Sequence, residues 1–280
     1  MAYKTILMHC NDKGAIRTLL GSAVQLAEKF QAHLTGLSVV PPVHVVAAGV
    51  PGGVPVVLDE HCKIYRQENP AMRQAFEEAL QGRGFVGQWM EEEAGAYSVA
   101  DVVLRRARAA DLLIASQTDP EWPNSAQLDI ADRLAVESGR PVLIVPRKGE
   151  FTRVGTRVVV AWNATREAAR AVFDAMPILQ RADFVKVVWI NPQSDDEDGE
   201  TLPAVDICET LSRHGVRCES MDEMKPKEGV GPMLLGCVAD AKADLLVMGC
   251  YGHTRLREFV FGGASRHVLE HMATPVLMSH

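Results

Sequence analysis

The sequence predicts an α/β protein made of two tandem open parallel five-stranded α/β sandwiches of Rossmann-like type. Three observations support this fold class. Short runs rich in Val, Ile and Leu alternate with segments of helical periodicity, which indicates a parallel sheet covered by helices on both faces. Several of these segments occur twice in the same order. The length of 280 residues also leaves room for about two domains.

The internal repeat sets the domain organisation. ADLLIAS at 110–116 returns as ADLLVMG at 243–249, and RPVLIVP near the end of the first copy returns as TPVLMSH at the end of the second. Between the copies lies PRKGEFTRVG, a stretch punctuated by proline and glycine. We therefore expect two copies of one domain, at residues 1–147 and 153–280.

In the first copy, five apolar runs predict five strands. A long excursion at 41–70 has a Pro/Gly-rich start and precedes the second helix. We interpret it as a connecting loop, with a partner-binding flap as the alternative. The predicted strands are Thr5–Cys10, His33–Val39, Gly84–Met90, Asp111–Ala115 and Pro141–Val145.

The second copy repeats this alternation with clearer helical segments. Its predicted strands are Val158–Trp162, Phe184–Ile190, Val216–Glu219, Asp244–Met248 and Pro275–Met278. Its predicted helices are Arg166–Leu179, Val205–His214, Val230–Lys242 and Ser265–His271.

Composition excludes several classes of protein. The net charge of -7 argues against a nucleic-acid-binding protein, which needs a basic surface. No apolar run is long enough to span a bilayer, and the N-terminus does not have the pattern of a signal peptide. Six cysteines without a CxxC pair are typical of reduced thiols. We expect a soluble cytoplasmic protein with no nucleic-acid or membrane partner.

Glycines mark a candidate anion site in the second copy. Gly249 and Gly252 follow a predicted strand directly, while Gly262 and Gly263 precede a predicted helix that starts near Ser265. Glycine lets a backbone approach an anion closely, and a helix start presents free N–H groups and the positive end of the helix dipole. Ser265 is the expected N-cap or phosphate donor. The pattern predicts a polyphosphate cradle made from backbone amides.

This spacing, glycine, two residues, glycine, nine residues, glycine and then Gly263-Ala264-Ser265, is similar to the ATP-binding loop of the universal stress protein family. The resemblance covers essentially the whole chain as two tandem family domains. It implies the nucleotide-binding α-hydrolase type of Rossmann-like fold and an adenine nucleotide as ligand, ATP with or without Mg²⁺. It also implies that the two copies pair as an internal pseudo-dimer, and a further homodimer stays open.

The resemblance also implies which residues bind the nucleotide. Asn163 takes the place of the family's acidic residue against the adenosine, which loses a charge, and Gly263 replaces a serine or threonine, which removes a hydroxyl. The first copy lacks the loop glycines after ADLLIA, so we expect only the second to bind. The implied set is Ala161, Asn163, Ile190, Met248, Gly249, Gly252, Gly262, Gly263, Ala264 and Ser265.

Three other patterns are interpreted as structural. GRGFVG at 82–87 precedes a strand instead of a helix, so we assign it to a helix end and a turn. His267, Glu270 and His271 spell an inverted zinc-peptidase motif, but no acidic third ligand follows. DDEDGE at 195–200 lacks the spacing of a calcium loop. Cys250, between two loop glycines, is expected to be an unreactive thiol, with a redox role as the alternative.

No catalytic set or metal site is identifiable from local sequence signatures. The sequence has no GxxxxGK[ST] motif, and phosphoryl transfer needs positioned cations, metal ligands and a group that orients the nucleophile. We therefore expect a nucleotide-binding stress or regulatory protein with at most slow ATP hydrolysis. The alternatives are a ligand-free interaction module and a true, slow ATPase.

Overall fold

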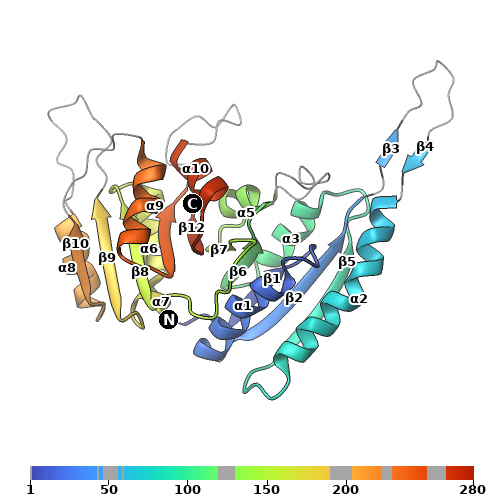
Figure 1. Cartoon of the computed structure of the whole chain (residues 1–280), viewed down its shortest axis with the longest axis horizontal. Coiled ribbons are helices and arrows are strands. Elements are labelled where there is room, and N and C mark those ends of the chain that lie inside the picture. Colours follow the sequence, from blue (N-terminus) through green and yellow to red (C-terminus); the bar gives the residue numbers. More distant parts are fainter. Residues whose placement is uncertain are drawn as a thin grey trace.

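A computed structural model of the chain describes residues 2–42, 44–46, 56–58, 60–118, 130–189, 204–221, 229–250 and 263–280. Within these ranges, ten strands form one continuous sheet with helices on both faces, and the two halves of the chain lie side by side (Figure 1). The predicted α/β fold class with two tandem parallel five-stranded units is confirmed.

The elements of the first half come from the N-terminal part of the chain. In order they are β1 (Thr5–His9), α1 (Ile16–Phe30), β2 (His33–Val40), β3 (His44–Val46), β4 (Val56–Leu58), α2 (Glu60–Leu80), β5 (Gly87–Glu93), α3 (Val99–Ala107), β6 (Leu112–Ser116), α5 (Ala131–Glu137) and β7 (Val142–Val145).

The second half repeats the succession of strands and helices. Its elements are β8 (Arg157–Trp162), α6 (Arg166–Asp174), α7 (Met176–Leu179), β9 (Phe184–Trp189), α8 (Ala204–Arg213), β10 (Cys218–Met221), α9 (Val230–Asp240), β11 (Leu245–Gly249), α10 (Gly263–His271) and β12 (Val276–Ser279).

The strands have the same spatial order in both halves. The sheet runs β10-β9-β8-β11-β12-β7-β6-β1-β2-β5. Neighbouring strands are parallel, except that β12 and β7 pair antiparallel where the halves meet. Apolar side chains on both faces of the central strands explain their nearly continuous Val, Ile and Leu runs.

The central strand pair is symmetric in sequence. Pro141 and Pro275 open equivalent segments, 134 residues apart. In the β7–β12 ladder Leu143 lies opposite its own equivalent, Leu277, and the two flanking pairs, Ile144–Val276 and Val142–Met278, are equivalent to each other at this offset. An approximate two-fold axis therefore passes between these two leucines.

Two hydrophobic cores lie on the two faces of the sheet. Helices α1, α2, α6, α7 and α8 contribute to one core, and α3, α5, α9 and α10 contribute to the other. Each core contains residues of both halves, so apolar burial holds the halves together across the whole sheet. Hydrogen bonds add to this: Ser22 of α1 donates to the carbonyl of Phe151 in the connecting segment, and the Tyr3 hydroxyl donates to the Asp174 carbonyl at 2.6 Å.

The interpretation of residues 41–70 as a connecting loop is wrong for most of the described part. Residues 44–46 and 56–58 form a small antiparallel pair that projects from one end of the molecule (Figure 1), and residues 60–70 belong to α2. We expect the second helix to follow residue 70, and proline is in general unfavourable inside helices. Pro70 nevertheless lies in the middle of α2. A buried stripe of this helix continues past the proline and is formed by Cys62, Tyr65, Asn69, Met72 and Phe76.

Other boundaries differ by smaller amounts. The predicted helix Arg166–Leu179 is two helices, because Ala175 interrupts it and Pro177 occupies the first turn of α7. Strand β5 begins at Gly87 instead of Gly84, after a turn in which Gly82 has a φ of 73°. That turn agrees with the assignment of GRGFVG to a helix end.

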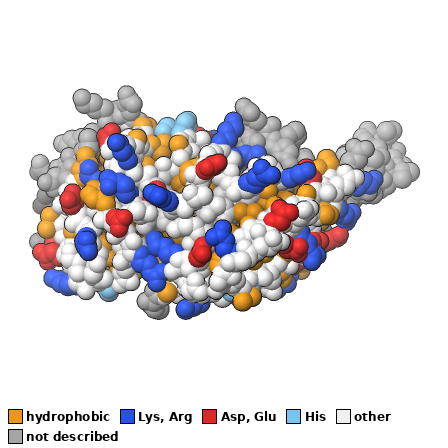
Figure 2. Space-filling view, turned by 60° about the horizontal axis from the view of Figure 1, so that its bottom comes forward, with side chains coloured by type: hydrophobic (Ala, Val, Ile, Leu, Met, Phe, Trp, Pro, Cys, Tyr) orange, Lys and Arg blue, Asp and Glu red, His pale blue; other side chains and the backbone are white. Residues whose placement is uncertain are grey.

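None of the described helices combines the length and the apolar character that crossing a bilayer requires. On the molecular face shown in Figure 2, basic and acidic side chains are interspersed and no broad surface of one sign is visible.

Candidate functional site

The described site residues lie on β8, in the turn that follows it, on β11 and in the first turn of α10. Ala161 and Met248 are on the neighbouring parallel strands β8 and β11. Helix α10 leads into β12, which is parallel to β11, so the start of α10 lies toward the carboxyl ends of these strands. Ile190, Gly252 and Gly262 lie outside the described residues, as does the DDEDGE segment.

Asn163 forms a tight turn between β8 and α6. Its side-chain oxygen accepts hydrogen bonds from the hydroxyl of Thr165 at 2.8 Å and from the Thr165 backbone N–H at 3.3 Å. Thr165 in turn caps α6 by accepting from the Ala168 N–H. Ala164, between them, has a left-handed φ of 56°, which is uncommon for alanine. The side-chain oxygen of Asn163, which an aspartate would also have, is thus used in the turn. The difference from an aspartate lies in the amide nitrogen, which can donate a hydrogen bond where a carboxylate oxygen would accept one.

Gly249 ends β11 where the strand meets the backbone of α6. A Cβ atom at this position would lie 2.5 Å from the carbonyl carbon of Glu167 and 2.6 Å from the nitrogen of Ala168. Both neighbours are backbone atoms and cannot rotate away. Glycine is therefore required here for packing, whatever the site binds.

The start of α10 is open in the described part of the structure. No described heavy atom lies within 4 Å of a Cβ built on Gly263. Helix α10 begins at Gly263, so Ser265 lies in its first turn and the expectation that Ser265 is the N-cap is wrong. Ser265 is 5% exposed, while Gly263 is exposed. The free N–H groups of a first helical turn, next to a position without a side chain, fit an anionic group.

Helix α10 packs against α9 at His267. A Cβ on Gly231 would lie 2.7 Å from the Cβ of His267, so the glycine allows this close contact. The rings of His267 and His271 stack with centroids 4.2 Å apart, and His271 Nδ1 lies 2.9 Å from the His267 carbonyl oxygen. Among the described residues no group of three potential ligands is arranged to hold a metal ion, and Glu270 pairs with Arg266.

A residue of the first half holds the other end of α10. The Gln117 amide donates to the carbonyl of Leu269 at 2.7 Å. The contact has a two-fold counterpart: Cys250, which follows β11 as Gln117 follows β6, lies with its Sγ 3.8 Å from the carbonyl of Ala135 in α5. Ala135 and Leu269 are equivalent positions at the offset of 134 residues. Each half therefore contacts the last helix of the other.

Cys250 is a buried thiol with no sign of activation. Burial raises its pKa to about 12, and the nearby carboxylates of Asp132 and Glu167 act in the same direction. The site thus carries a thiol that is protonated at neutral pH, in agreement with the expectation of an unreactive cysteine.

Glu167 is a buried carboxylate at the start of α6. Burial by itself would raise its pKa, but the hydrogen bond from its own backbone N–H and the Arg166 guanidinium outweigh this and leave the pKa lowered. The Glu167 carboxylate, which helps to raise the pKa of Cys250, adds negative charge near the end of β11 and makes the start of α10 the more suitable position for an anion.

The equivalent place in the first half is filled by its own side chains. His9 stands where Ala161 stands in the second half and is buried, and this burial lowers its pKa to about 4. Asn11, the equivalent of Asn163, donates to the Val39 carbonyl at 2.6 Å and accepts from the Val39 N–H at 2.8 Å. This asparagine extends the sheet and is 4% exposed, so it offers nothing to a ligand.

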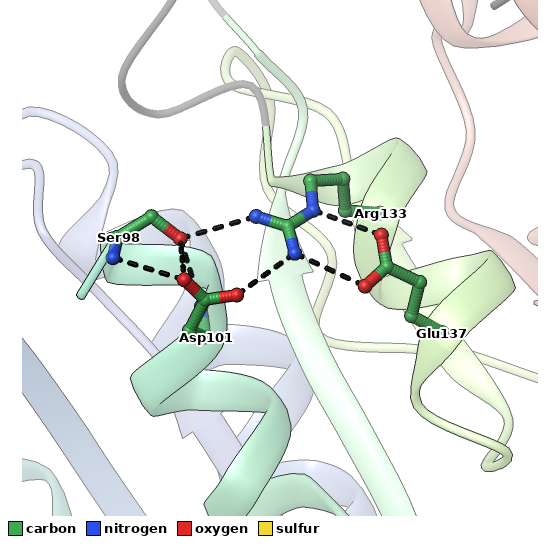
Figure 3. Close-up of polar contacts among 4 residues, drawn as sticks. All are labelled: Ser98, Asp101, Arg133 and Glu137. Carbon is green, nitrogen blue, oxygen red and sulfur yellow. Dashed lines mark hydrogen bonds and ion pairs between the residues drawn. The ribbon is translucent and has the colours of Figure 1, made fainter.

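The first half also fixes its last helix differently. Arg133 of α5 donates to Ser98 and Asp101 at the start of α3 and forms a bidentate pair with Glu137 (Figure 3). These bonds, led by those from Ser98 and Arg133, lower the pKa of Asp101 to about 2. Arg133 is equivalent to His267 at the same offset. The first half thus fixes its last helix by the hydrogen bonds and ion pairs of an arginine, whereas the second half uses the close contact of Gly231 with His267.

Sequence reasoning missed three residues of the site: Thr165, Glu167 and Gln117. Thr165 carried a signal, since a threonine before a helical pattern is a common N-cap. Glu167 and Gln117 carried none, because their roles depend on contacts between elements far apart in the chain.

Comparisons with known proteins agree with this architecture. Residues 228–280 match the model of the Universal stress protein family. A universal stress protein from Archaeoglobus fulgidus DSM 4304 aligns in structure with a TM-score of 0.67 and 14% identity, over 98% of this chain and 97% of that one. A functionally unknown protein from Pseudomonas aeruginosa PAO1 aligns with a TM-score of 0.57 and 16% identity, over 99% and 92%.

The resemblance to tandem universal stress proteins is thus confirmed by the family model and by the shared fold. At these identities the structural likeness establishes the fold and does not carry a ligand across. No curated protein is similar enough in sequence to count as a match.

Proposed function

We propose that the chain is a stress-response or regulatory protein that binds one adenine nucleotide, ATP, in its second half. The observation that carries this proposal is the open first turn of α10, in which Gly263 has no described neighbour that would exclude a phosphate. The glycine spacing of the adjoining loop and the family match over residues 228–280 support the same site.

The residues divide into two groups by the part of the nucleotide that they would contact. The backbone N–H groups of Gly263, Ala264 and Ser265 would bind phosphate oxygens, with Gly249, Gly252 and Gly262 shaping the approach. Ala161 and Met248 would line the adenine together with Ile190, and Asn163 would face the adenosine. Because Asn163 uses its oxygen in the turn, its amide would donate where a carboxylate would accept.

Bound ATP has a regulatory role in this proposal, and hydrolysis is at most slow. The nucleotide would favour one arrangement of the loop before α10, and it can do so only to the extent that it binds that arrangement better. We assign no catalytic residue and no resident metal. Mg²⁺ would accompany the triphosphate as its counter-ion.

We further propose that residues 1–147 and 153–280 are two domains that form an internal pseudo-dimer. The symmetric β7–β12 register and the reciprocal contacts of Gln117 and Cys250 support this division. The first domain, whose equivalent place is filled by His9 and Asn11, would serve as the partner that completes the second. We expect the protein to be cytoplasmic, without nucleic-acid or membrane partners.

The test compares ATP–Mg²⁺ binding to the full chain and to Gly263→Glu. A carboxylate in the first turn of α10 meets no described neighbour and favours the helix dipole, so the variant should fold. It should repel phosphate and weaken binding by about tenfold or more, which corresponds to roughly 1.4 kcal/mol. Native mass spectrometry of the purified protein should show one nucleotide per chain, and isothermal titration should give the affinity.

The matched control is Gly236→Glu, an equally open and exposed glycine of α9 with the same change of charge. It should leave the affinity unchanged. Equal binding by both variants would place the nucleotide elsewhere. Two nucleotides per chain would contradict the filled first half, and no binding at all would favour a ligand-free interaction module. Phosphate release over many turnovers would favour the ATPase alternative.

A further inference from the structure

The six cysteines fall into two groups by burial and position. Cys10, Cys62, Cys237 and Cys250 are buried, whereas Cys208 and Cys218 are half-buried. The latter two lie on α8 and β10, which follow each other in the chain and pack together at the outer end of the second half. They are therefore the thiols that combine access to solvent with proximity to each other.

The contact between the two cysteines is direct. The Cys218 thiol lies 3.4 Å from the backbone carbonyl oxygen of Cys208, so its sulfur reaches the helix at the position of its partner. Burial, and after it the neighbouring Cys218 thiol, raise the pKa of Cys208, so Cys218 is the thiol expected to react first with an oxidant. Both side chains pack against the same core, on the face covered by α8.

From this geometry we propose that Cys208 and Cys218 are a dithiol site for oxidants, which a hydroperoxide converts to an intramolecular disulfide. The Cys218 thiol reduces the hydroperoxide, becomes a sulfenic acid and releases an alcohol, or water when the oxidant is hydrogen peroxide. The second sulfur then attacks the sulfenic sulfur, forms the S–S bond and releases water. In total the two thiols lose two protons and two electrons, which equals two hydrogen atoms, and the peroxide O–O bond is reduced.

The position of the pair gives the disulfide a structural effect. Strand β10 is the last strand of the sheet and pairs only with β9 among the described strands. A disulfide would tie this edge strand to α8 and close the loop from 208 to 218. The first half has no counterpart, because Gly87, the equivalent of Cys218 in strand register, packs under the side chain of Leu80. This inference does not depend on the proposed nucleotide site.

The experiment treats the full reduced chain with hydrogen peroxide and measures its intact mass and its disulfide-linked peptides. We expect the loss of two hydrogen atoms per chain and a peptide link between residues 208 and 218. Reductant should reverse both. Hydrogen exchange of residues 204–221 should become slower in the oxidised chain.

Cys208→Ser and Cys218→Ser should each abolish the loss of two hydrogen atoms, and Cys237→Ser should retain it. Serine is nearly isosteric, and far-UV circular dichroism under reducing conditions confirms that each variant is folded. The proposal is overturned if the folded wild-type chain keeps six free thiols, if the link maps to other cysteines or between chains, or if the sulfurs only gain oxygen.

Discussion

At the scale of single residues, two glycines of the same motif differ in what surrounds them. Gly249 is confined by the backbone of α6, and Gly263 is open among the described residues. A glycine pattern in a sequence does not distinguish a glycine that packing requires from one at an open position, since the conformational freedom of glycine could explain either. The distinction decides which substitutions report on a ligand and which report only on folding.

We therefore expect Gly249→Ala and Gly263→Ala to behave differently. The methyl group at residue 249 would overlap backbone atoms of α6, so unfolding free energy should fall by roughly 2 kcal/mol or more. At residue 263 the change should stay within about 0.5 kcal/mol. Urea unfolding followed by circular dichroism measures both. Equal losses would mean that the close approach of β11 to α6 is relaxed in solution.

Residue-scale chemistry also explains what the sequence could and could not predict of the site. Gly249, Gly263 and Ser265 stand beside recognisable strand and helix patterns, so their places at the end of β11 and in the first turn of α10 could be anticipated. The use of Asn163 in the Thr165 cap could not, because an asparagine after a strand is compatible with either a turn or a ligand contact. Burial of Glu167 depends on where β11 lies, which no local pattern contains.

At the scale of elements, α10 is held in its middle and at its end by different parts of the chain. Its first turn is the candidate anion site, Gly231 of α9 admits His267 in its middle, and Gln117 of the first half binds its last carbonyls. A short helix gains most of its stability from such tertiary contacts. The first half thus contributes to the order of the candidate site without taking part in it.

Gln117→Glu tests this contribution. The change keeps the shape of the side chain, but it replaces an amide donor by a carboxylate facing the Leu269 carbonyl and the negative end of α10. We expect a loss of about 1–3 kcal/mol of stability and faster hydrogen exchange in α10. Gln180→Glu is the control, because its amide makes a similar bond to the carbonyl of His214 on an exposed surface. If both variants lose the same unfolding free energy, the Gln117 contact between the halves contributes no more to stability than an exposed hydrogen bond.

The elements themselves were largely predictable, and the exceptions share a cause. Apolar runs identified the strands of the main sheet. The repeated segments indicated that strands and helices follow each other along the chain in the same order in both halves. Both exceptions lie at prolines: α2 runs through Pro70, although the second helix was expected only after residue 70, and Pro177 marks a break in a segment that helical periodicity predicted to be one helix. In both cases packing against the sheet, which a local pattern does not contain, decides whether the helix continues.

At the scale of the whole molecule, two repeats share one sheet and two continuous cores. The repeat in the sequence predicted the two units, but it could not fix the register in which they join. That register places Leu143 opposite Leu277 and makes the shared edge complementary to itself. A self-complementary edge implies that either half can pair with a copy of itself.

Residues 153–280 expressed alone should therefore form a dimer through β12. Sedimentation velocity should show the dimer at micromolar concentration, and Leu277→Arg should give monomers because it places a charge at the symmetric contact. The matched change Leu235→Arg, at a half-buried position on α9, should leave the dimer intact. A monomeric wild-type fragment would show that the edge needs the first half specifically.

The covalent connection between the halves has a consequence for how the protein responds to dilution. Two separate subunits joined by the same strand edge would dissociate as their concentration fell, and a site that relied on both would be lost with them. Here the connecting segment lies along α1 and keeps the partner edge within reach at an effective concentration in the millimolar range, as is typical of short linkers. The pairing of β7 with β12 is thus independent of how many copies a cell contains, so a few molecules are as completely assembled as many.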